Sequence, residues 1–290
     1  MRYRLLFCIL FFAVIAADAQ SFYSVRRDRT LIFSAGSGTS TYFGELANPG
    51  DYFDARPNIN IGLSYFVAPQ ISVRAEATWF QLAGSDAKAG DPTRTPRNLS
   101  FVSDNYEIGL TGALHLFPLG NRYYQRPVFN AYGFAGLAVM RFNPRAELNG
   151  TKYPLQPLMT EGVKYSRTQL VIPYGLGVRL KAGPFFNLAI EGGYRLTFTD
   201  YLDDVSTVHP DKSTWTDPLR IALSDRSGEL NNGVSRFEPG RIRGNPEKND
   251  GYFLLNIKVE YYLPTNFLFK NQSKLYRSKR KVYYRRPRRR

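Results

Sequence analysis

The sequence is poor in the residues that carry redox, metal and nucleophilic chemistry, with one cysteine and two histidines among 290 residues. The cysteine, Cys8, lies inside an apolar N-terminal segment, so the rest of the chain has no thiol for a disulfide or a thiolate-bound metal. Long hydrophobic runs are also missing. The strongest, Leu5 to Ile15, has 11 residues, whereas a membrane-spanning helix needs about 20. A disulfide-stapled domain and a helical membrane protein are therefore excluded.

The N-terminus has the pattern of a secretory signal. Arg2 and Arg4 precede the apolar run, and an A-x-A cleavage site follows at 17–19. We expect residues 1–19 to be removed and residues 20–30 to form an N-terminal periplasmic segment. An exported chain without other cysteines suits the bacterial periplasm or outer membrane.

Strands are predicted by alternation of apolar and polar residues with period two. In the stretch from Ile71 to Trp79, the odd positions are apolar and the even positions are Ser, Arg, Glu and Thr. Similar stretches predict eight strands, near 31–43, 58–67, 70–82, 100–117, 127–142, 168–181, 185–199 and 251–263. The register is uncertain in the first stretch, which is rich in Gly, Ser and Thr, and in the fifth, which is apolar on both faces.

The connections between these stretches alternate in length. Residues 68–69, 118–126 and 182–184 are short or moderate, whereas 44–57, 83–99, 143–167 and 200–250 are long. Outer-membrane barrels have short periplasmic turns and long extracellular loops. We therefore predict an all-β fold, an eight-stranded antiparallel transmembrane β-barrel over residues 31–264. Both termini then lie in the periplasm.

The predicted interior is charged. Its inward positions include four acids and four bases, which are Arg74, Glu76, Glu107, Arg179, Glu191, Arg195, Lys258 and Glu260. An eight-stranded barrel is just wide enough to be filled by side chains, so we expect these groups to pair and close the interior. A soluble lipocalin-like barrel is the alternative fold, but its lumen would be apolar.

Catalytic motifs are not recognisable in the sequence. His115 lies on the polar face of a predicted strand, where a hydrogen-bonded structural role is expected. The one acidic cluster is Asp200, Asp203 and Asp204, followed by His209 and Asp211. Hydrogen-bonded turns explain it best, with ion or partner binding, or a rim hydrolase, as alternatives. We therefore expect no enzyme activity, no cofactor and no resident metal.

Positive charge is concentrated in the tail, residues 265–290. Most of the net charge of +15 comes from Lys270, Lys274, Arg277, Lys279, Arg280, Lys281, Arg285, Arg286, Arg288, Arg289 and Arg290. Such a segment cannot bury a core, and we expect it to be disordered on its own. Binding to anionic lipid, docking to an acidic periplasmic protein and a solvated tail without a partner all remain open. Nucleic-acid binding is not expected for an exported chain.

Several strings resemble one Bacteroidota family, the outer-membrane β-barrel family that includes PorG of the type IX secretion system. They are Arg97-Asn98-Leu99-Ser100-Phe101, Leu155-Gln156-Pro157-Leu158 with Thr160-Glu161-Gly162, Ile172-Pro173-Tyr174-Gly175, Thr199-Asp200-Tyr201-Leu202-Asp203-Asp204-Val205-Ser206-Thr207, and Arg243-Gly244-Asn245 with Asp250. The resemblance covers residues 30 to 263, and the Asp200–Thr207 string is its most specific part.

The resemblance implies a non-enzymatic role in protein secretion across the outer membrane. Barrels of this kind are thought to anchor a periplasmic ring built from a lipoprotein and its partner protein, of PorK and PorN type, and some serve gliding motility. The family also contains paralogues, so a structural or small-ligand-binding barrel is the alternative. The basic tail is not part of the resemblance, although it is compatible with docking to the ring.

Overall fold

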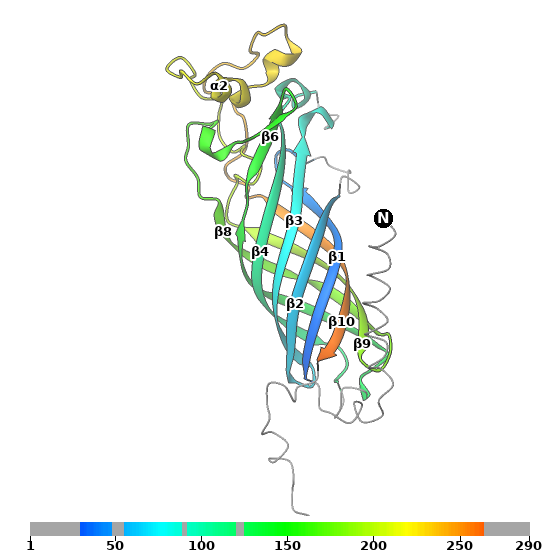
Figure 1. Cartoon of the computed structure of the whole chain (residues 1–290). Helices are drawn as coiled ribbons and strands as arrows, with labels where there is room; N and C mark the ends of the chain where they lie inside the picture. Colours follow the sequence, from blue (N-terminus) through cyan, green and yellow to red (C-terminus); the bar gives the residue numbers. More distant parts are fainter. Residues whose placement is uncertain (1–29, 48–54, 89–91, 120–124, 264–290) are drawn as a thin grey trace, which may run out of the picture.

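The computed structural model describes residues 30–47, 55–88, 92–119 and 125–263. Eight long antiparallel strands form a closed barrel (Figure 1). They are β1 (Leu31–Phe43), β2 (Arg56–Ala68), β3 (Ile71–Ser85), β4 (Ser100–His115), β5 (Phe129–Arg141), β8 (Thr168–Lys181), β9 (Phe186–Thr197) and β10 (Gly251–Leu263). Pairing of β1 with β10, from Leu31 opposite Leu263 to Phe43 opposite Gly251, closes the barrel. The predicted fold class is confirmed.

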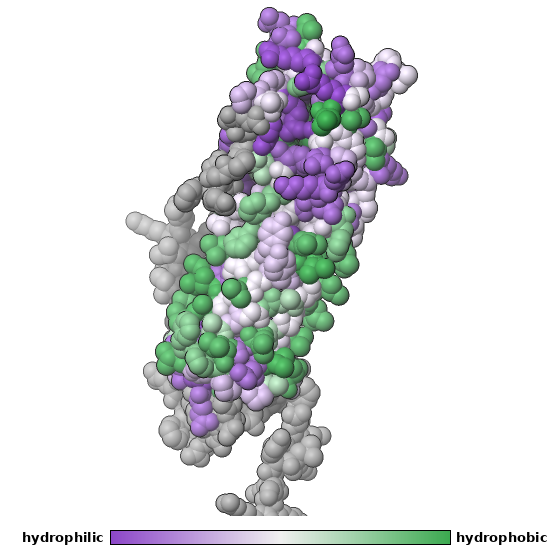
Figure 2. Space-filling view, turned by 180° about the vertical axis from the view of Figure 1, so that it is seen from behind, coloured by the Kyte–Doolittle hydropathy of each residue, from purple (hydrophilic) through white to green (hydrophobic). Residues whose placement is uncertain are grey.

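Side chains alternate between the outside and the inside of the barrel as the sequence pattern predicts. Ile59 and Ile61 on β2 are 55% and 53% exposed, whereas the alternating Asn58 and Asn60 are buried. Apolar side chains cover much of the barrel wall, and hydrophilic ones gather at one end (Figure 2). A continuous apolar outer surface on a closed barrel is suited to contact with lipid tails. Separately, no helix among the described residues is long and apolar enough to cross a membrane.

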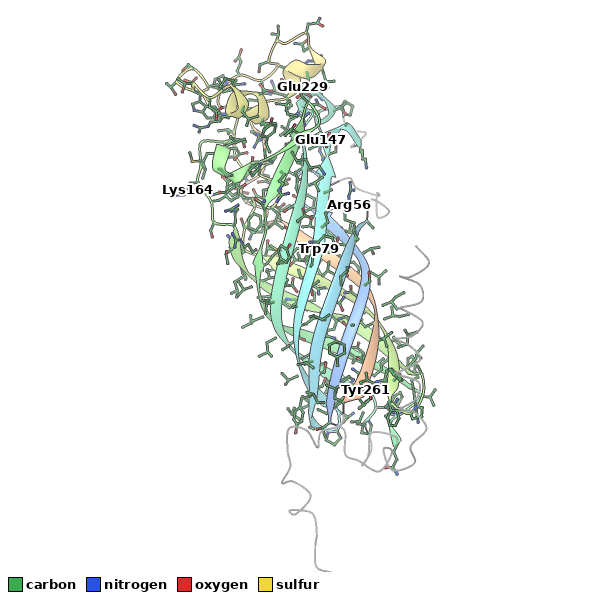
Figure 3. The ribbon with its side chains drawn as sticks, viewed as in Figure 1. Arg56, Trp79, Glu147, Lys164, Glu229 and Tyr261 are labelled. Atoms are coloured by element: carbon green, nitrogen blue, oxygen red, sulfur yellow. The ribbon has the colours of Figure 1, made fainter. Side chains whose placement is uncertain are left out.

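Outward-facing aromatic residues form two groups along the wall. Trp79 lies higher on the wall, whereas Tyr261 lies near its lower end (Figure 3). The upper group pairs Trp79 with Tyr106 and Tyr194 with Tyr174 and Phe253; the lower group pairs Tyr261 with Phe33 and Phe186. From Phe253 to Tyr261 the strand advances roughly 26 Å. At a tilt of about 40° this is roughly 20 Å along the barrel axis, close to the height of an outer-membrane apolar band.

Connection length separates the two ends of the barrel. One end of the barrel, which we name the short-turn end, carries the shorter connections. They are the tight turns at 69–70 and 182–185 and the moderate connection 116–128. The opposite, long-loop end carries 44–55, 86–99, 142–167 and 198–250. We call the described residues of these long connections the cap.

The predicted long connection at 143–167 is present, and it contains a hairpin that was not predicted from the sequence, formed by β6 (Pro144–Leu148) and β7 (Thr151–Pro154). Strand β6 pairs with β4 and thereby extends the barrel wall. Asn149 and Gly150 form the hairpin turn with φ of 51° and 78°. Two positive φ angles are the requirement of a two-residue hairpin turn, and Asn-Gly is the sequence signal for it.

The rest of the cap contains short helices. They are η3 (Asp86–Lys88), η4 (Thr95–Arg97), η6 (Gln156–Leu158), α2 (Pro218–Ser224) and η7 (Ser227–Leu230). The Asp217 side chain caps α2 by accepting a hydrogen bond from the Leu219 amide. These helices lie beyond the end of the barrel wall.

The barrel interior holds the expected charged layer. Lys258 lies between two carboxylates, with Nζ 2.5 Å from Glu76 and 2.6 Å from Glu191, and Arg74 also pairs with Glu191. Arg179 pairs with Glu260 at 2.6 Å, and Arg195 lies 3.8 Å from Glu107. All eight predicted inward charges therefore face inward and lie within 4 Å of an opposite charge.

Apolar clusters lie on both sides of the charged layer. The larger fills the barrel at the long-loop end and includes Tyr42, Phe80, Phe101, Met140, Leu202 and Tyr252. The smaller, at the short-turn end, contains Ile32, Phe185 and Tyr262. The guanidinium of Arg126 lies 4.8 Å from the Tyr262 ring centre and donates to Gly183, Pro184 and Phe186 carbonyls. The interior is thus filled by layers of apolar, charged and again apolar side chains.

Candidate functional site in the cap

The acidic segment singled out by the sequence lies inside the cap. Asp200, Asp203, Asp204 and His209 are each less than 7% exposed. These four residues therefore do not form a solvent-exposed cluster on the rim of the barrel. Burial of so many polar groups requires hydrogen-bond partners, which the neighbouring loops supply.

Asp203 and Asp204 organise the backbone of the long connection. Asp203 accepts hydrogen bonds from the amides of Val205 at 2.9 Å and Leu46 at 3.2 Å, which joins the chain after β9 to the chain after β1. Asp204 accepts from the hydroxyls of Thr160 and Tyr165, the latter at 2.6 Å. Asp203 thus forms a local hydrogen-bonded turn with Val205, whereas Asp204 holds side chains of another connection.

A buried ion pair between Glu161 and Arg243 joins the connection before β8 to the connection after β9. Arg243 Nη1 lies 2.6 Å from Glu161 Oε1 and also donates to the Asp204 carbonyl. The same carboxylate accepts from the amides of Ser206 and Thr207. One side chain therefore satisfies the donors of a turn and fixes a cation.

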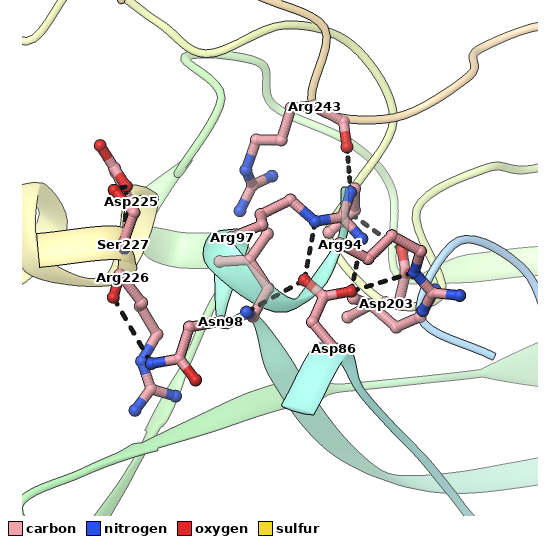
Figure 4. A network of polar contacts seen from close by, with 12 residues as sticks. Asp86, Arg94, Arg97, Asn98, Asp203, Asp225, Arg226, Ser227 and Arg243 are labelled. Carbon is pink, nitrogen blue, oxygen red and sulfur yellow. Dashed lines mark hydrogen bonds and ion pairs between the residues drawn. The ribbon is translucent and has the colours of Figure 1, made fainter. Parts of the chain in front are cut away.

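A second ion-pair centre is Asp86, which is fully buried and binds two arginines (Figure 4). Arg97 donates to both of its oxygens at 2.7 and 2.8 Å, and Arg94 donates at 3.2 Å. Arg97 also donates to the Arg243 carbonyl. The network thus joins the connection after β3 to the one after β9.

Burial and like charge shift the pKa values of the cap acids. Burial and the neighbouring Glu45 raise the pKa of both Asp200 and Asp203 to about 8. Burial raises the pKa of Asp204 to about 6 against the opposing effect of Arg243. The pKa of Asp250 is raised well above its usual value by burial and by Asp203. The ionised forms of these four buried acids are therefore disfavoured in the folded cap.

Three carboxylates meet at the mouth of the barrel. Atoms of Glu45, Asp200 and Asp250 all lie within 4.8 Å of one another. Asp250 accepts from the Tyr42 hydroxyl at 2.6 Å and the Leu202 amide at 2.9 Å. This group differs from the predicted acidic cluster, because only Asp200 belongs to both.

The proposed catalytic partners are not arranged for catalysis. The His209 ring stacks on Phe237 at 4.7 Å, and neither of its nitrogens has a hydrogen-bond partner among the described residues. Burial and Arg243 lower the pKa of His209 to about 4. Asp203 and Asp204 are hydrogen-bonded elsewhere, so they do not orient His209 as a base. Asp211 accepts from the Ser213 amide at the surface.

Other residues named from the sequence are distributed as follows. His115 is buried in the barrel and lies 2.9 Å from the Ser72 hydroxyl, as expected for a structural residue. The signal at 1–19, the segment at 20–29 and all eleven tail cations lie outside the described residues.

The sequence did not single out Asp86, Glu161 and Arg243 as partners. Arg97, Glu161 and Arg243 occur in the strings that carry the family resemblance, which is the only signal that pointed to them. Arg126 was not indicated by any pattern, since it follows a turn and precedes the strand by three residues.

Several solved structures of bacterial proteins are similar to this fold. Neisserial surface protein A is 12% identical, with a TM-score of 0.42, covering 80% of this chain and 97% of that one. The attachment invasion locus protein Ail of Yersinia pestis is 9% identical, with a TM-score of 0.38, covering 81% and 98%. A major outer membrane protein of Thermus thermophilus is 13% identical, with a TM-score of 0.40, covering 80% and 98%. No curated protein matches the chain.

The closed eight-stranded antiparallel wall with an apolar outer surface defines an outer-membrane β-barrel protein. Within that class, the chain belongs to the family described as "Domain of unknown function (DUF6089)", whose model matches residues 4–222. The matched region includes β1 to β9 and the acidic string at 200–207.

Proposed function

We propose that this protein is a non-enzymatic outer-membrane component of the type IX secretion system that contacts a periplasmic ring complex. The observation that carries the proposal is the filled barrel interior together with the eleven cations that follow β10 in the sequence. A barrel closed by ion pairs has no open path for solutes, so its function resides at its ends. The similarity of the Asp200–Thr207 string to the PorG-containing family supports secretion as the process.

The proposal orients the short turns toward the periplasm, because outer-membrane barrels place their long loops outside. Strand β10 ends at Leu263 on the short-turn end, and the basic tail follows it. Eleven cations there would attract an acidic surface and make the association sensitive to salt. The partner would be a ring of a lipoprotein and a second protein, of PorK and PorN type. Anionic outer-membrane lipid, which is negatively charged like an acidic protein surface, is a further candidate partner for the tail.

A paralogous structural barrel that has another task, or one that binds a small ligand, is the second candidate. A rim hydrolase is disfavoured, because His209 has no hydrogen bond to Asp203 or Asp204 and its pKa is lowered. Within the part of the chain that the structure describes, neither Asp203 nor Asp204 therefore orients His209 as a base.

Deletion of the gene in a Bacteroidota host tests the proposal. We expect the amount of type IX cargo in the medium to fall and gliding, where present, to stop. A copy ending at Phe269 should restore the barrel in the membrane without restoring secretion. A His209→Gln copy should restore secretion fully. Normal secretion in the deletion strain would show that the chain is a paralogue with another role.

A further inference from the structure

The group of Glu45, Asp200 and Asp250 joins three chain segments that are far apart in sequence. Glu45 follows β1, Asp200 follows β9, and Asp250 immediately precedes β10. Their carboxylate atoms lie within 4.8 Å of one another. Asp200 is 6% exposed and Asp250 is 2% exposed, whereas Glu45 is half-buried.

Asp200 lacks the partners that a buried carboxylate requires. Neither of its oxygens accepts a hydrogen bond of normal geometry from the described residues, although Ser206 is close enough to lower its pKa. Glu45 Oε2 likewise has no such partner. Buried carboxylates without partners are costly, and in native proteins they are paired or coordinate metals.

We propose that Glu45, Asp200 and Asp250 form a Ca²⁺ site that fastens the cap to the mouth of the barrel. Carboxylate oxygens are the ligands that hard divalent cations prefer. Two ligands of one ion cannot be farther apart than twice the bond length, which is about 4.6–5.2 Å for Ca²⁺ and about 4.0–4.2 Å for Mg²⁺. Atoms within 4.8 Å of one another are compatible with this limit for Ca²⁺. Ca²⁺ also accepts irregular sets of protein oxygens, whereas Mg²⁺ requires near-ideal octahedral geometry and keeps several waters, so three carboxylates from separate connections suit Ca²⁺ better.

Among the described residues, no ion pair joins an arginine or lysine to these three carboxylates. Arg97 acts on Glu45 at a distance, but it donates to Asp86 and to the Arg243 carbonyl. The alternative to a metal is a proton shared between Glu45 and Asp250, whose pKa values are both raised. A shared proton would still leave the buried oxygens of Asp200 without a partner, which is why the geometry favours the ion.

Terbium luminescence in a neutral detergent tests the site with the full chain. Tb³⁺ occupies oxygen-rich calcium sites, and Tyr42, whose hydroxyl is 2.6 Å from Asp250, is placed to transfer excitation energy to it. We expect EDTA-treated protein to give a saturable signal that Ca²⁺ displaces with a dissociation constant of about 10⁻⁴–10⁻³ M. Mg²⁺ should displace it at least about tenfold less well.

Asp200→Asn is the decisive variant, because it removes charge from a side chain whose oxygens hold no hydrogen bond of normal geometry. We expect its affinity for Ca²⁺ to fall at least about tenfold. Asp211→Asn, which changes an exposed acid in the same connection, should bind like the wild type. Equal binding by Asp200→Asn and wild type, no signal in the wild type, or equal displacement by Mg²⁺ would each overturn the proposal. Heat-modifiable mobility in gels verifies that each variant has folded.

Discussion

At the scale of single residues, carboxylates hold the cap together. Asp86, Asp204 and Glu161 each accept hydrogen bonds from more than one donor, and two of them also bind a buried arginine. Irregular loops expose many backbone donors that have no strand or helix partner. A buried carboxylate has several acceptor positions, so it satisfies these donors and fixes the chain.

Replacement of Asp86 tests this arrangement. Asp86→Ala removes the carboxylate to which Arg97 donates, and the loss of one partner of a buried ion pair costs about 3–5 kcal/mol. We expect limited proteolysis of the cap to become faster while the barrel stays folded. Asp211→Ala, at the surface of the same cap, should leave the cleavage rate unchanged. A wild-type rate in Asp86→Ala would show that the ion pair adds no stability.

The raised pKa of Asp203 makes cap stability depend on pH. Its value in the folded protein is about 8, against an ordinary value of 3.8, so folding favours the protonated form. The stability that protonated Asp203 contributes to the fold is complete below pH 3.8, the ordinary pKa. It is lost as the pH rises toward 8. His209 acts in the opposite direction, from its ordinary 6.5 down to about 4, and so does not interfere above pH 6.5.

In EDTA, proteolysis of the cap should therefore become faster from pH 6.5 to 8.5. In Asp203→Asn, the slope of cap stability against pH should become shallower. Loss of one titrating proton reduces this slope by at most about 1.4 kcal/mol per pH unit. Proteases of different pH optima serve as controls for the cleavage step. An identical pH dependence in the variant would contradict the role of Asp203.

The sequence could indicate the cap acids but not their environment. Asp200, Asp203 and Asp204 were recognisable as a cluster in a long connection, and Asp203 accepts from the Val205 amide as a hydrogen-bonded turn requires. Asp204 instead accepts from side chains of another connection. Their burial depends on partners distant in the chain, since Leu46 and Asp203 are 157 positions apart. Arg97 and Arg243 are 146 positions apart. No local pattern records such contacts.

At the scale of elements, period-two alternation was sufficient to place all eight barrel strands. It works because an apolar residue facing lipid and a polar residue facing the interior are opposite requirements at successive positions. The fifth stretch was ambiguous because β5 turns Tyr132 and Phe134 inward, where Arg179 and Arg74 lie 5.1 and 5.3 Å from their ring centres. These two aromatic rings therefore contact arginines of the charged layer. The β6–β7 hairpin was missed although Asn149-Gly150 was its signal.

Lys258 on β10 tests the charged layer. Lys258→Met keeps the length of the side chain but leaves Glu76 and Glu191 without this cation. We expect the free energy of unfolding in urea to fall by about 3–5 kcal/mol. Adding Glu76→Gln should restore part of the loss, and Lys152→Met on exposed β7 should have little effect. Wild-type stability in Lys258→Met would mean that the pairs do not stabilise the barrel.

At the scale of the whole molecule, the barrel is filled along its length and loops of different length lie at opposite ends. The apolar clusters and the charged layer between them occupy the interior. The cap, which lies above the wall (Figure 1), contains a second network of buried ion pairs. This organisation predicts a membrane protein that acts through its surfaces.

Electrical recording tests the filled interior. In planar bilayers, the purified protein should give no reproducible conductance steps under conditions in which a porin does. Stepwise openings in the wild type that change in Lys258→Met would contradict a closed barrel and favour a small-ligand or porin-like function.

The most direct test of the central claim is a pull-down of the tagged protein from detergent-solubilised outer membrane of its host. Three forms are compared: full length, a form ending at Phe269, and a full-length form with the tail cations replaced by glutamine. We predict that the ring lipoprotein and its partner, identified by mass spectrometry, co-purify with the full-length protein alone and dissociate as salt is raised. Recovery of neither ring protein with any form would contradict a role in type IX secretion, and equal recovery with all three would place the contact on the barrel instead of the tail.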